Sequence, residues 1–365
     1  TAFFLKEYFY FMHTSKKTIY IKHIIIILIV SSLLLLACCS SQNPLYISRK
    51  NGMNTVSFLA MDTIIAISVD SQVTDKELEN AYYEIQQFEN AYSAYITDSE
   101  LYEINQSSSK KTEISEDLYN QILISQKVSE MTDGAFDITV LPLINLWGFS
   151  NGEYKVPKEA EIIKALETVS FKKIHLTEQS LLLQDGASID LGAVAKGYIG
   201  QKIADKLQEE GSSFGILSLG GNMQLYGKKP DGSNWNIAIQ DPFDESSIIG
   251  IISTTDCSVI TSGSYQRYFI ENDIKYHHIL DPKTGYPADN GLISVTIVAK
   301  DGAYSDALST ALFVTGLEKG IEIWKEYNDF EAVFITEDSS VYITEGLKDR
   351  FTPESEDFLF EYVYK

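Results

Sequence analysis

The chain has 365 residues, of which 44% are hydrophobic, 12% aromatic and 22% charged, with only 8 prolines. This composition excludes a disordered or collagen-like protein and predicts a chain that buries a large core. The 51 acidic residues outnumber the 29 basic ones, and a surface with a net charge of −22 repels a phosphate backbone, so we expect no nucleic-acid partner.

The first 37 residues are typical of an export signal. Lysines precede an apolar run over residues 24–37, which is shorter than the roughly 20 residues that a membrane-spanning helix needs. The run ends in Ala37 before Cys38, a pattern that resembles a bacterial lipoprotein signal. We expect cleavage before Cys38, attachment of fatty acid (palmitate) to its thiol, and a flexible tether over residues 38–55. The protein would then be exported and lipid-anchored to the bacterial membrane; an uncleaved membrane anchor is the alternative.

Residues 56–365 carry no repeat, long linker or Pro-rich stretch, and we expect them to form a single domain. Periodicity and turn residues predict, in chain order, a strand-like segment 57–69, helices over 75–90 and 116–131, a short strand 189–191, a helix over 195–208, and strands 214–219, 223–226 and 235–240. Strands and helices mix without regular alternation. The pattern therefore favours an α+β fold with mixed, largely antiparallel sheets and packed helices over a doubly wound parallel fold.

Residues 189–198 place glycines just before the amino end of a predicted helix. Glycine permits close backbone approach, and a helix amino end favours an anion. Lys196 lies in this first turn, where its charge opposes the helix dipole. A phosphate between Lys196 and the helix end would explain it; the alternative is a tight turn with Lys196 in solvent.

Asp306 and Thr310 are four residues apart in a predicted helix start and therefore share one face. A carboxylate and a hydroxyl are hard oxygen ligands, which Mg²⁺ prefers while it keeps waters or phosphate oxygens for the rest of its shell. The alternative is that Asp306 complements the helix dipole and Thr310 back-bonds to the helix.

Two adjacent histidines, His277 and His278, precede a turn-rich segment 281–287. Strand alternation would point their side chains to opposite faces, so only one could enter a site. Segments 132–139, 219–222 and 261–265 add turns of glycine and polar residues suited to phosphate or ribose binding.

The order of these segments resembles the FAD:protein FMN transferase family (ApbE-like) over nearly all of the chain after the signal. The matching segments are 61–63, 93–105, 132–149, 190–193, 196–198, 219–222, 261–263, 278–285 and 306–310. The resemblance implies that family's α+β fold, with residues 56–365 as the flavin transferase catalytic domain. It implies magnesium as cofactor, FAD as donor substrate, and transfer of FMN to a Thr or Ser hydroxyl of an exported acceptor protein. The products would be a phosphoester-linked flavin and AMP.

The resemblance also assigns roles to individual residues. The family's metal site falls on the main-chain oxygen of Ala193 with Asp306 and Thr310, and its FAD contacts fall on Met61, Ala135, Phe136, Asp137, Asp190, Lys196 and Ile279. Met61 is followed by Asp62 where relatives commonly have glycine, and we carry over no residue from the segment 92–95. His278 would accept the proton of the attacking hydroxyl, since an unperturbed pKa of ~6.5 suits this role near neutral pH.

Two other functions remain open. A metal-dependent FAD pyrophosphatase would use the same residues but release free FMN and AMP. A lipid-anchored flavin- or solute-binding receptor would leave Lys196, Asp306 and Thr310 without a purpose. No segment looks like the family's acceptor motif, which ends in a Ser/Thr-Gly-Ala-Ser/Thr-like tetrapeptide. We therefore expect modification of another exported protein, such as a subunit of a redox complex.

Overall fold

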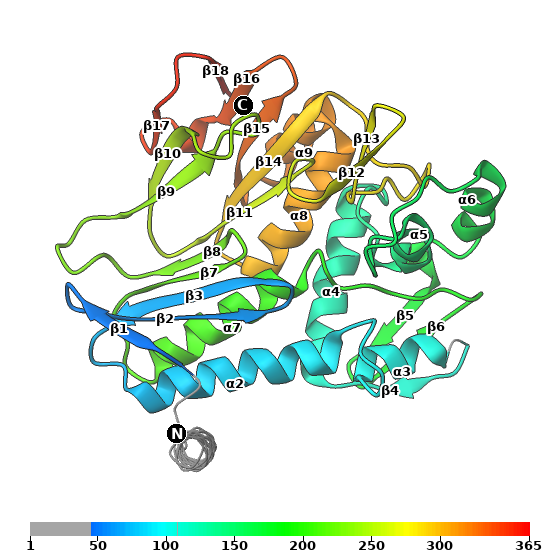
Figure 1. The fold of residues 1–365 in the computed structure, drawn as a ribbon, viewed down its shortest axis with the longest axis horizontal. Coiled ribbons are helices and arrows are strands. Elements are labelled where there is room, and N and C mark those ends of the chain that lie inside the picture. The colour runs from blue at the N-terminus through cyan, green and yellow to red at the C-terminus, as the bar shows by residue number, and fades with distance from the viewer. Residues whose placement is uncertain (1–44, 108) are drawn as a thin grey trace, which may run out of the picture. The chain divides into compact units, whose positions relative to one another are not determined.

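A ten-stranded sheet is the framework of the fold (Figure 1), and its strand order is β1-β2-β3-β7-β8-β11-β14-β15-β16-β18. The computed structural model describes residues 45–107 and 109–365, so the predicted signal and Cys38 lie outside the described residues. Residues Ile47–Lys365 pack as one unit. Neighbouring strands of the sheet are antiparallel except for the parallel pair β16 and β18. The predicted α+β fold with largely antiparallel sheets is confirmed.

The α-helices are α2 (Asp75–Tyr92), α3 (Glu100–Gln106), α4 (Glu116–Met131), α5 (Leu141–Trp147), α6 (Glu159–Leu166), α7 (Ala195–Glu209), α8 (Gly302–Thr315) and α9 (Leu317–Tyr327). The strands of the large sheet are β1 (Ile47–Lys50), β2 (Met53–Ala60), β3 (Thr63–Asp70), β7 (Gly215–Leu219), β8 (Asn222–Tyr226), β11 (Ser258–Gly263), β14 (Leu292–Ala299), β15 (Glu331–Thr336), β16 (Ser340–Thr344) and β18 (Leu359–Val363). Three small sheets contain β4 (Thr112–Glu113), β6 (Ser180–Leu183) and β5 (Ile174–Thr177); β17 (Phe351–Pro353), β10 (Ile248–Thr254) and β9 (Trp235–Gln240); and β12 (Tyr268–Glu271) with β13 (Ile274–His277). Among the described residues no helix is both long and apolar enough to cross a membrane.

The helices predicted over 75–90, 116–131 and 195–208 are confirmed as α2, α4 and α7, and the first two have a side-chain cap of their own. Helix α4 matches the prediction of 116–131, and Ser115 caps it by accepting a hydrogen bond from the Leu118 N–H. Helix α2 begins with a capping box between Thr74 and Glu77 and extends two residues beyond the prediction, to Tyr92. These helices fold as expected because their local signals agree with the tertiary packing.

Two strand predictions are wrong, and turn chemistry explains one of them. The segment 57–69 is not continuous, because Met61 and Asp62 both have left-handed φ angles, of 52° and 57°, and form the two-residue turn between β2 and β3. Residues 189–191 form no strand; the backbone there is a loop whose Asp190 N–H donates to the Ile138 carbonyl.

The last part of the predicted tether is ordered sheet. We placed it over residues 38–55, but strand β1 begins at Ile47 and pairs with β2 through a two-residue turn at Asn51 and Gly52. Asn-Gly is a strong hairpin signal because both residues adopt left-handed φ angles readily. Ordered sheet therefore begins within the predicted tether.

Helices and a second sheet cover the two faces of the large sheet. Helix α2 contacts β2, helix α7 contacts β7 and β8, and helix α8 contacts β11 and β14 (Figure 1). On the opposite face, the sheet of β17, β10 and β9 encloses a core whose largest members include Trp235 and Phe351. The central strands of the framework are therefore buried on both sides and form a rigid base for the site, whereas Leu59 of β2 and Ile64 of β3 are exposed.

A separate aromatic cluster joins α5 and α6 to β12, β13 and the loop that follows β13. Trp147, Phe149 and Leu280 are buried together, with Phe269 and Tyr276 packed against them. The Trp147 Nε1–H donates to the Gly285 carbonyl at 2.8 Å. This cluster ties the helical segment of α5 and α6 to the loop that follows β13.

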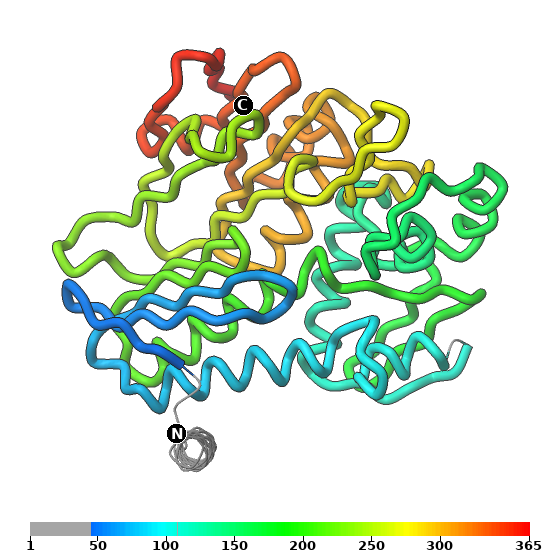
Figure 2. Tube along the Cα trace, viewed as in Figure 1, coloured from blue at the N-terminus to red at the C-terminus, as the bar shows by residue number. Residues whose placement is uncertain are grey.

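Helices α7 and α8 lie side by side although about a hundred residues separate them (Figure 2). They meet at glycines: a Cβ atom on Gly197 would overlap the Gly302 carbonyl oxygen and lie 2.7 Å from the Asp306 Cβ. The close approach therefore requires glycine at position 197.

We expect Gly197→Ala to destabilise the fold by about 1–3 kcal/mol, because the added methyl group forces the two helices apart. Gly200→Ala on the same helix is the control, since its Cβ would lie 3.2 Å from a flexible Leu219 methyl group and alanine favours helix. Thermal unfolding followed by circular dichroism checks both variants. Equal melting temperatures would contradict a backbone contact that only glycine permits.

Candidate active site

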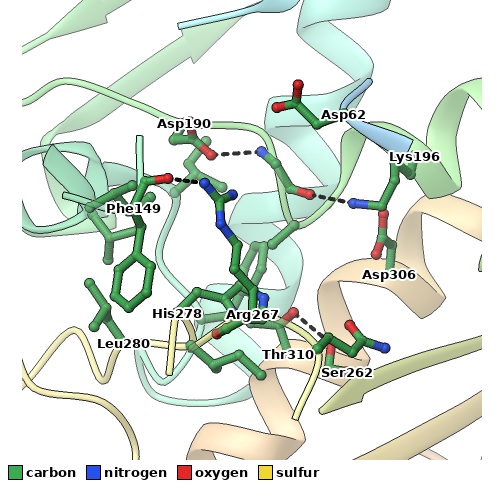
Figure 3. A pocket seen from close by; sticks show the side chains of 18 of the residues that line it. Asp62, Phe149, Asp190, Lys196, Ser262, Arg267, His278, Leu280, Asp306 and Thr310 are labelled. Atoms are coloured by element: carbon green, nitrogen blue, oxygen red, sulfur yellow. Dashed lines mark hydrogen bonds between the residues drawn. The ribbon is translucent and has the colours of Figure 1, made fainter. Parts of the chain in front are cut away.

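One cavity of about 430 Å³ opens between the amino end of α7, the second and third turns of α8, and the ends of β3, β8 and β11 (Figure 3). Every residue that the sequence suggested for donor, metal or proton contact lines it: Met61, Ala135, Phe136, Asp137, Asp190, Ala193, Lys196, His278, Ile279, Asp306 and Thr310. The volume is typical of a site for a small molecule or cofactor. The fold thus brings together segments that are distant in the sequence.

The loop before α7 is organised around Asp190. Its carboxylate accepts hydrogen bonds from the Gly192 N–H at 2.8 Å and from the Tyr95 hydroxyl at 3.0 Å. Burial raises the pKa of Asp190 above its usual range, while these two bonds oppose the rise. The carboxylate therefore shapes the loop that leads into α7.

Lys196 lies at the second position of α7 and lines the cavity. Its ammonium group donates to the Gly192 carbonyl at 3.2 Å (Figure 3). A single bond to a partly exposed carbonyl uses one of three ammonium donors. Lys196 can therefore donate to an anion in the cavity, as the sequence suggested.

Asp306 lies in α8 but caps the neighbouring helix, α7. It lies in the second turn of α8, whose N-cap is Asp301, and its Oδ2 accepts the Gly197 N–H of α7 at 2.8 Å. Helix α7 has Val194 at its N-cap, which offers no side-chain oxygen, so Asp306 caps α7 from the neighbouring helix. The interpretation of Asp306 as a first-turn dipole partner within its own helix is wrong.

Thr310 is held by a neighbouring strand. Its hydroxyl lies 3.0 Å from Ser262 Oγ of β11, and Ser309 rather than Thr310 back-bonds to the helix, at the Asp306 carbonyl. Ser262 Oγ also lies 2.8 Å from Ser309 Oγ. This hydroxyl network orients Thr310 beside Asp306 on the cavity side of α8.

The cavity has more negative than positive side chains. The charged lining residues are four carboxylates and two bases: Asp62, Asp137, Asp190, Asp306, Lys196 and Arg267. A pyrophosphate would add further negative charge, which a divalent cation offsets. The donor set fits Mg²⁺: Asp306 and Thr310 offer hard oxygens, and the Gly197 N–H donates to Asp306 instead of to the Ala193 carbonyl four residues earlier. Residues 45–107 and 109–365 contain no group of three His, Cys, Asp or Glu side chains that could hold a metal ion.

The two histidines divide as strand alternation predicted. His277 is buried against Phe313, and its Nε2 lies 2.9 Å from the Ala288 carbonyl, so it has a structural role. His278 lines the cavity, and its Nδ1 lies 3.1 Å from the Arg267 carbonyl. A carbonyl only accepts, so Nδ1 carries the proton and Nε2 of the neutral ring is the acceptor. Burial lowers the pKa of His278 to about 4, below the value that we expected from sequence.

Asp137 acts on its own loop. Its Oδ1 accepts from the Thr139 N–H at 2.8 Å and the Thr139 hydroxyl at 2.6 Å, and its Oδ2 accepts from the Phe171 N–H at 2.6 Å. These bonds use both carboxylate oxygens. Asp137 therefore fixes the loop that presents Ala135 and Phe136 to the cavity.

Sequence reasoning missed two residues of the cavity. Tyr95 was set aside with the segment 92–95, although its hydroxyl binds Asp190; burial and the Asp190 charge raise its pKa. Arg267 lies in the turn before β12, and its guanidinium donates to the Phe149 carbonyl. Neither residue belongs to a glycine turn or a helix start, and neither is among the residues that the family resemblance assigned.

Comparison with known proteins gives one consistent family. The ApbE family model matches residues 61–334. An FAD:protein FMN transferase of Klebsiella pneumoniae (strain 342) is 31% identical over 309 residues, which cover 83% of this chain and 95% of the relative. One of Treponema pallidum (strain Nichols) is 33% identical over 291 residues, covering 75% and 80%.

Solved structures agree with the sequence relatives. The crystal structure of the ApbE protein from Thermotoga maritima superposes with a TM-score of 0.76 at 31% identity, covering 82% of this chain and 99% of that one. The flavin transferase ApbE from Vibrio cholerae gives 0.74 at 28% identity, covering 84% and 100%. Since family model, sequence relatives and folds coincide over most of its length, this chain belongs to the ApbE family.

Proposed function

We propose that this chain transfers FMN from FAD to a Ser or Thr hydroxyl of an acceptor protein, with Mg²⁺ bound, and releases AMP. Membership of the ApbE family and the names of its relatives support transfer of FMN from FAD to protein. The observation that carries the finer proposal is the cavity itself. Lys196, the Asp306–Thr310 pair and the neutral ring of His278 line the same space.

The proposed reaction is a phosphoryl-type displacement. The acceptor oxygen forms a bond to the phosphorus that carries riboflavin, and the bond from that phosphorus to the bridging oxygen breaks. AMP leaves with the electron pair, and FMN remains on the acceptor as a phosphoester. Such reactions depend mainly on positioning and on stabilising the charge of the phosphate oxygens.

Lys196 and the amino end of α7 would hold the pyrophosphate. The ammonium group is already in the cavity, bonded to the Gly192 carbonyl, and needs only a side-chain rotation to reach an anion beside it. The helix end adds a partial positive charge that favours the same anion.

Asp306, Thr310 and the Ala193 carbonyl would hold the magnesium ion. Asp306 Oδ2 already accepts from Gly197, which leaves Oδ1 for a metal. Bound Mg²⁺ supplies Lewis-acid stabilisation of the charge on the phosphate oxygens. Ser262 keeps the Thr310 hydroxyl directed for this role.

His278 would take the proton of the acceptor hydroxyl at Nε2. The Arg267 carbonyl fixes the proton of the neutral ring on Nδ1, so Nε2 presents its lone pair. The low pKa keeps the ring neutral at physiological pH, so the Nε2 lone pair is free, while the same burial makes the ring a weaker base than a free imidazole.

Incubation with an exported acceptor domain, FAD and Mg²⁺, followed by mass spectrometry, tests the function. We expect an acceptor peptide that has gained FMN, and AMP in equal amount. Free FMN without peptide modification would show a pyrophosphatase instead, and an unchanged FAD pool would show a binding protein.

We expect Asp306→Asn to lower FMN transfer roughly 100-fold, the equivalent of about 2.7 kcal/mol of lost barrier reduction. The amide oxygen can keep the Gly197 hydrogen bond, so the melting temperature should change little, and excess Mg²⁺ should restore part of the activity. Thr310→Val should act in the same direction but less strongly.

Asp301→Asn is the matched control for Asp306→Asn. Asp301 caps α8 through the Tyr304 N–H at 2.9 Å, lies five residues away and does not line the cavity. Asparagine is an equally good N-cap, so activity should persist. Wild-type transfer by Asp306→Asn at limiting Mg²⁺ would refute the metal site.

The pH dependence of kcat/KM should reflect the low pKa of His278. Protonation of Nε2 abolishes its capacity to accept a proton, and the folded pKa is about 4. We therefore expect the His278-dependent loss of kcat/KM only as pH falls towards about 4, and not near ~6.5. A histidine NMR titration, with the His278→Gln variant to assign the resonance, measures the same pKa directly. A midpoint near 6.5 in both measurements would be inconsistent with this environment.

We propose that the protein is exported and anchored through a fatty acid on Cys38, with its acceptor on the same side of the membrane. Cys38→Ser should abolish labelling by radioactive palmitate in cells while the purified domain retains FMN transfer, because the thiol attaches the lipid and takes no part in catalysis. Cys39→Ser is the control and should still be labelled. Labelling of Cys38→Ser would show that the signal has been misinterpreted.

A further inference from the structure

The segment 219–222 has no role in the mechanism proposed above, yet it forms part of the cavity wall. Gly220 and Gly221, with φ angles of 64° and 95°, make the two-residue turn that pairs Leu219 with Asn222. A Cβ atom on Gly220 would overlap Thr63 Oγ1. The turn therefore packs tightly against the start of β3, and both Gly220 and Asn222 line the cavity.

Asn222 carries a buried amide with an unused donor. The residue is only 6% exposed, and its Nδ2 has no hydrogen-bond partner in the part of the chain that the structure describes. An unpaired buried donor destabilises a protein unless a ligand or water pairs with it. Gln224 also has an unpaired buried amide atom, the acceptor Oε1, but Gln224 does not line the cavity, whereas Asn222 does.

The neighbouring Gln224 shows which way this face of β8 points. Its Cβ lies 3.8 Å from where a Cβ on Gly200 of α7 would be, and its Oε1 lies 2.9 Å from the corresponding point on Gly302 of α8. Side chains two residues apart on a strand point to the same face. Asn222 therefore points towards α7 and α8, the helices that carry Lys196 and Asp306.

We propose that Asn222 is a further donor-binding residue, whose Nδ2 donates a hydrogen bond to an anionic oxygen of the FAD pyrophosphate. This inference rests on the proposed function and adds a residue that the sequence resemblance does not assign. Asn222 lines the cavity, and the Cβ–Cγ torsion has a broad energy minimum, so the amide can turn Nδ2 towards a bound oxygen there.

The chemistry of the cavity favours a phosphate oxygen as the partner. Four carboxylates repel the pyrophosphate, and only Lys196 and Arg267 among the charged lining residues attract it. An amide adds a donor without adding charge, and a hydrogen bond to a charged oxygen is stronger than one to a neutral group. Asn222 would thus contribute to binding of the phosphates without competing with Asp306 for the metal.

Titration of FAD and of riboflavin into Asn222→Leu, followed by flavin fluorescence with Mg²⁺ and without acceptor, tests the proposal. We expect FAD affinity to fall roughly ten- to hundred-fold, as for the loss of one hydrogen bond to a charged group. Riboflavin affinity should hardly change, because it has no phosphate. The melting temperature of the free protein should stay equal or rise, since an unpaired buried amide has been removed.

Gln224→Met is the matched control, because it removes an amide with an unpaired buried oxygen from the same face of the same strand, outside the cavity. It should keep wild-type FAD affinity. Asn222→Asp keeps the size but replaces the donor with a charge, and should weaken FAD binding at least as much as leucine does.

Several outcomes would overturn the proposal. Unchanged FAD affinity in Asn222→Leu excludes the contact, and an equal loss for riboflavin excludes the phosphate as its partner. Wild-type affinity in Asn222→Asp would show that an oxygen, not the N–H, is used. A wild-type protein that binds no FAD would instead refute the proposed function as a whole.

Discussion

The hydrogen bond from the Gly197 N–H to Asp306 Oδ2 is the contact on which the site depends. It joins the amino end of α7 to the second turn of α8 and supplies the cap that Val194 cannot provide. The glycine at 197 lets the two helices come close enough for this bond. The same contact brings Lys196, on one helix, and Thr310, on the other, to one cavity. The Asp306 carboxylate is thus both the cap of α7 and a candidate metal ligand.

Under the proposed function, a cavity wall rich in carboxylates suits a site that binds phosphate together with a metal ion. A wholly basic cavity would bind the pyrophosphate strongly in the ground state and would not need the ion. Here the carboxylates exceed the bases, so under the proposed function the pyrophosphate and Mg²⁺ would favour each other's binding, and we expect neither to bind well alone.

Much of the fold and site followed from local patterns, and the failures share one cause. Helix α4 was predicted to the residue because Ser115 caps an apolar stripe, and His278 was separated from His277 by strand alternation. Tyr95 and Arg267 were missed because their contacts, to Asp190 and to the Phe149 carbonyl, form only after distant segments pack. The role of Asp306 as a cap for α7 was hidden for the same reason. Residue spacing predicts the structure within one helix or strand, whereas the contacts of Tyr95, Arg267 and Asp306 join residues from two different segments.

Two features of the cavity lower the stability of the free protein and acquire a reason only when donor is bound. Met61 is a long side chain at a left-handed φ of 52°, a conformation that L-residues other than glycine adopt at a cost. Asn222 keeps a donor buried without a partner in the described residues. Met61 lies in the two-residue turn between β2 and β3, Asn222 directly follows the turn between β7 and β8, and both line the cavity. A fold selected for stability alone would relax the turn at Met61 and replace the amide of Asn222 with an apolar group, so we infer that ligand binding maintains both.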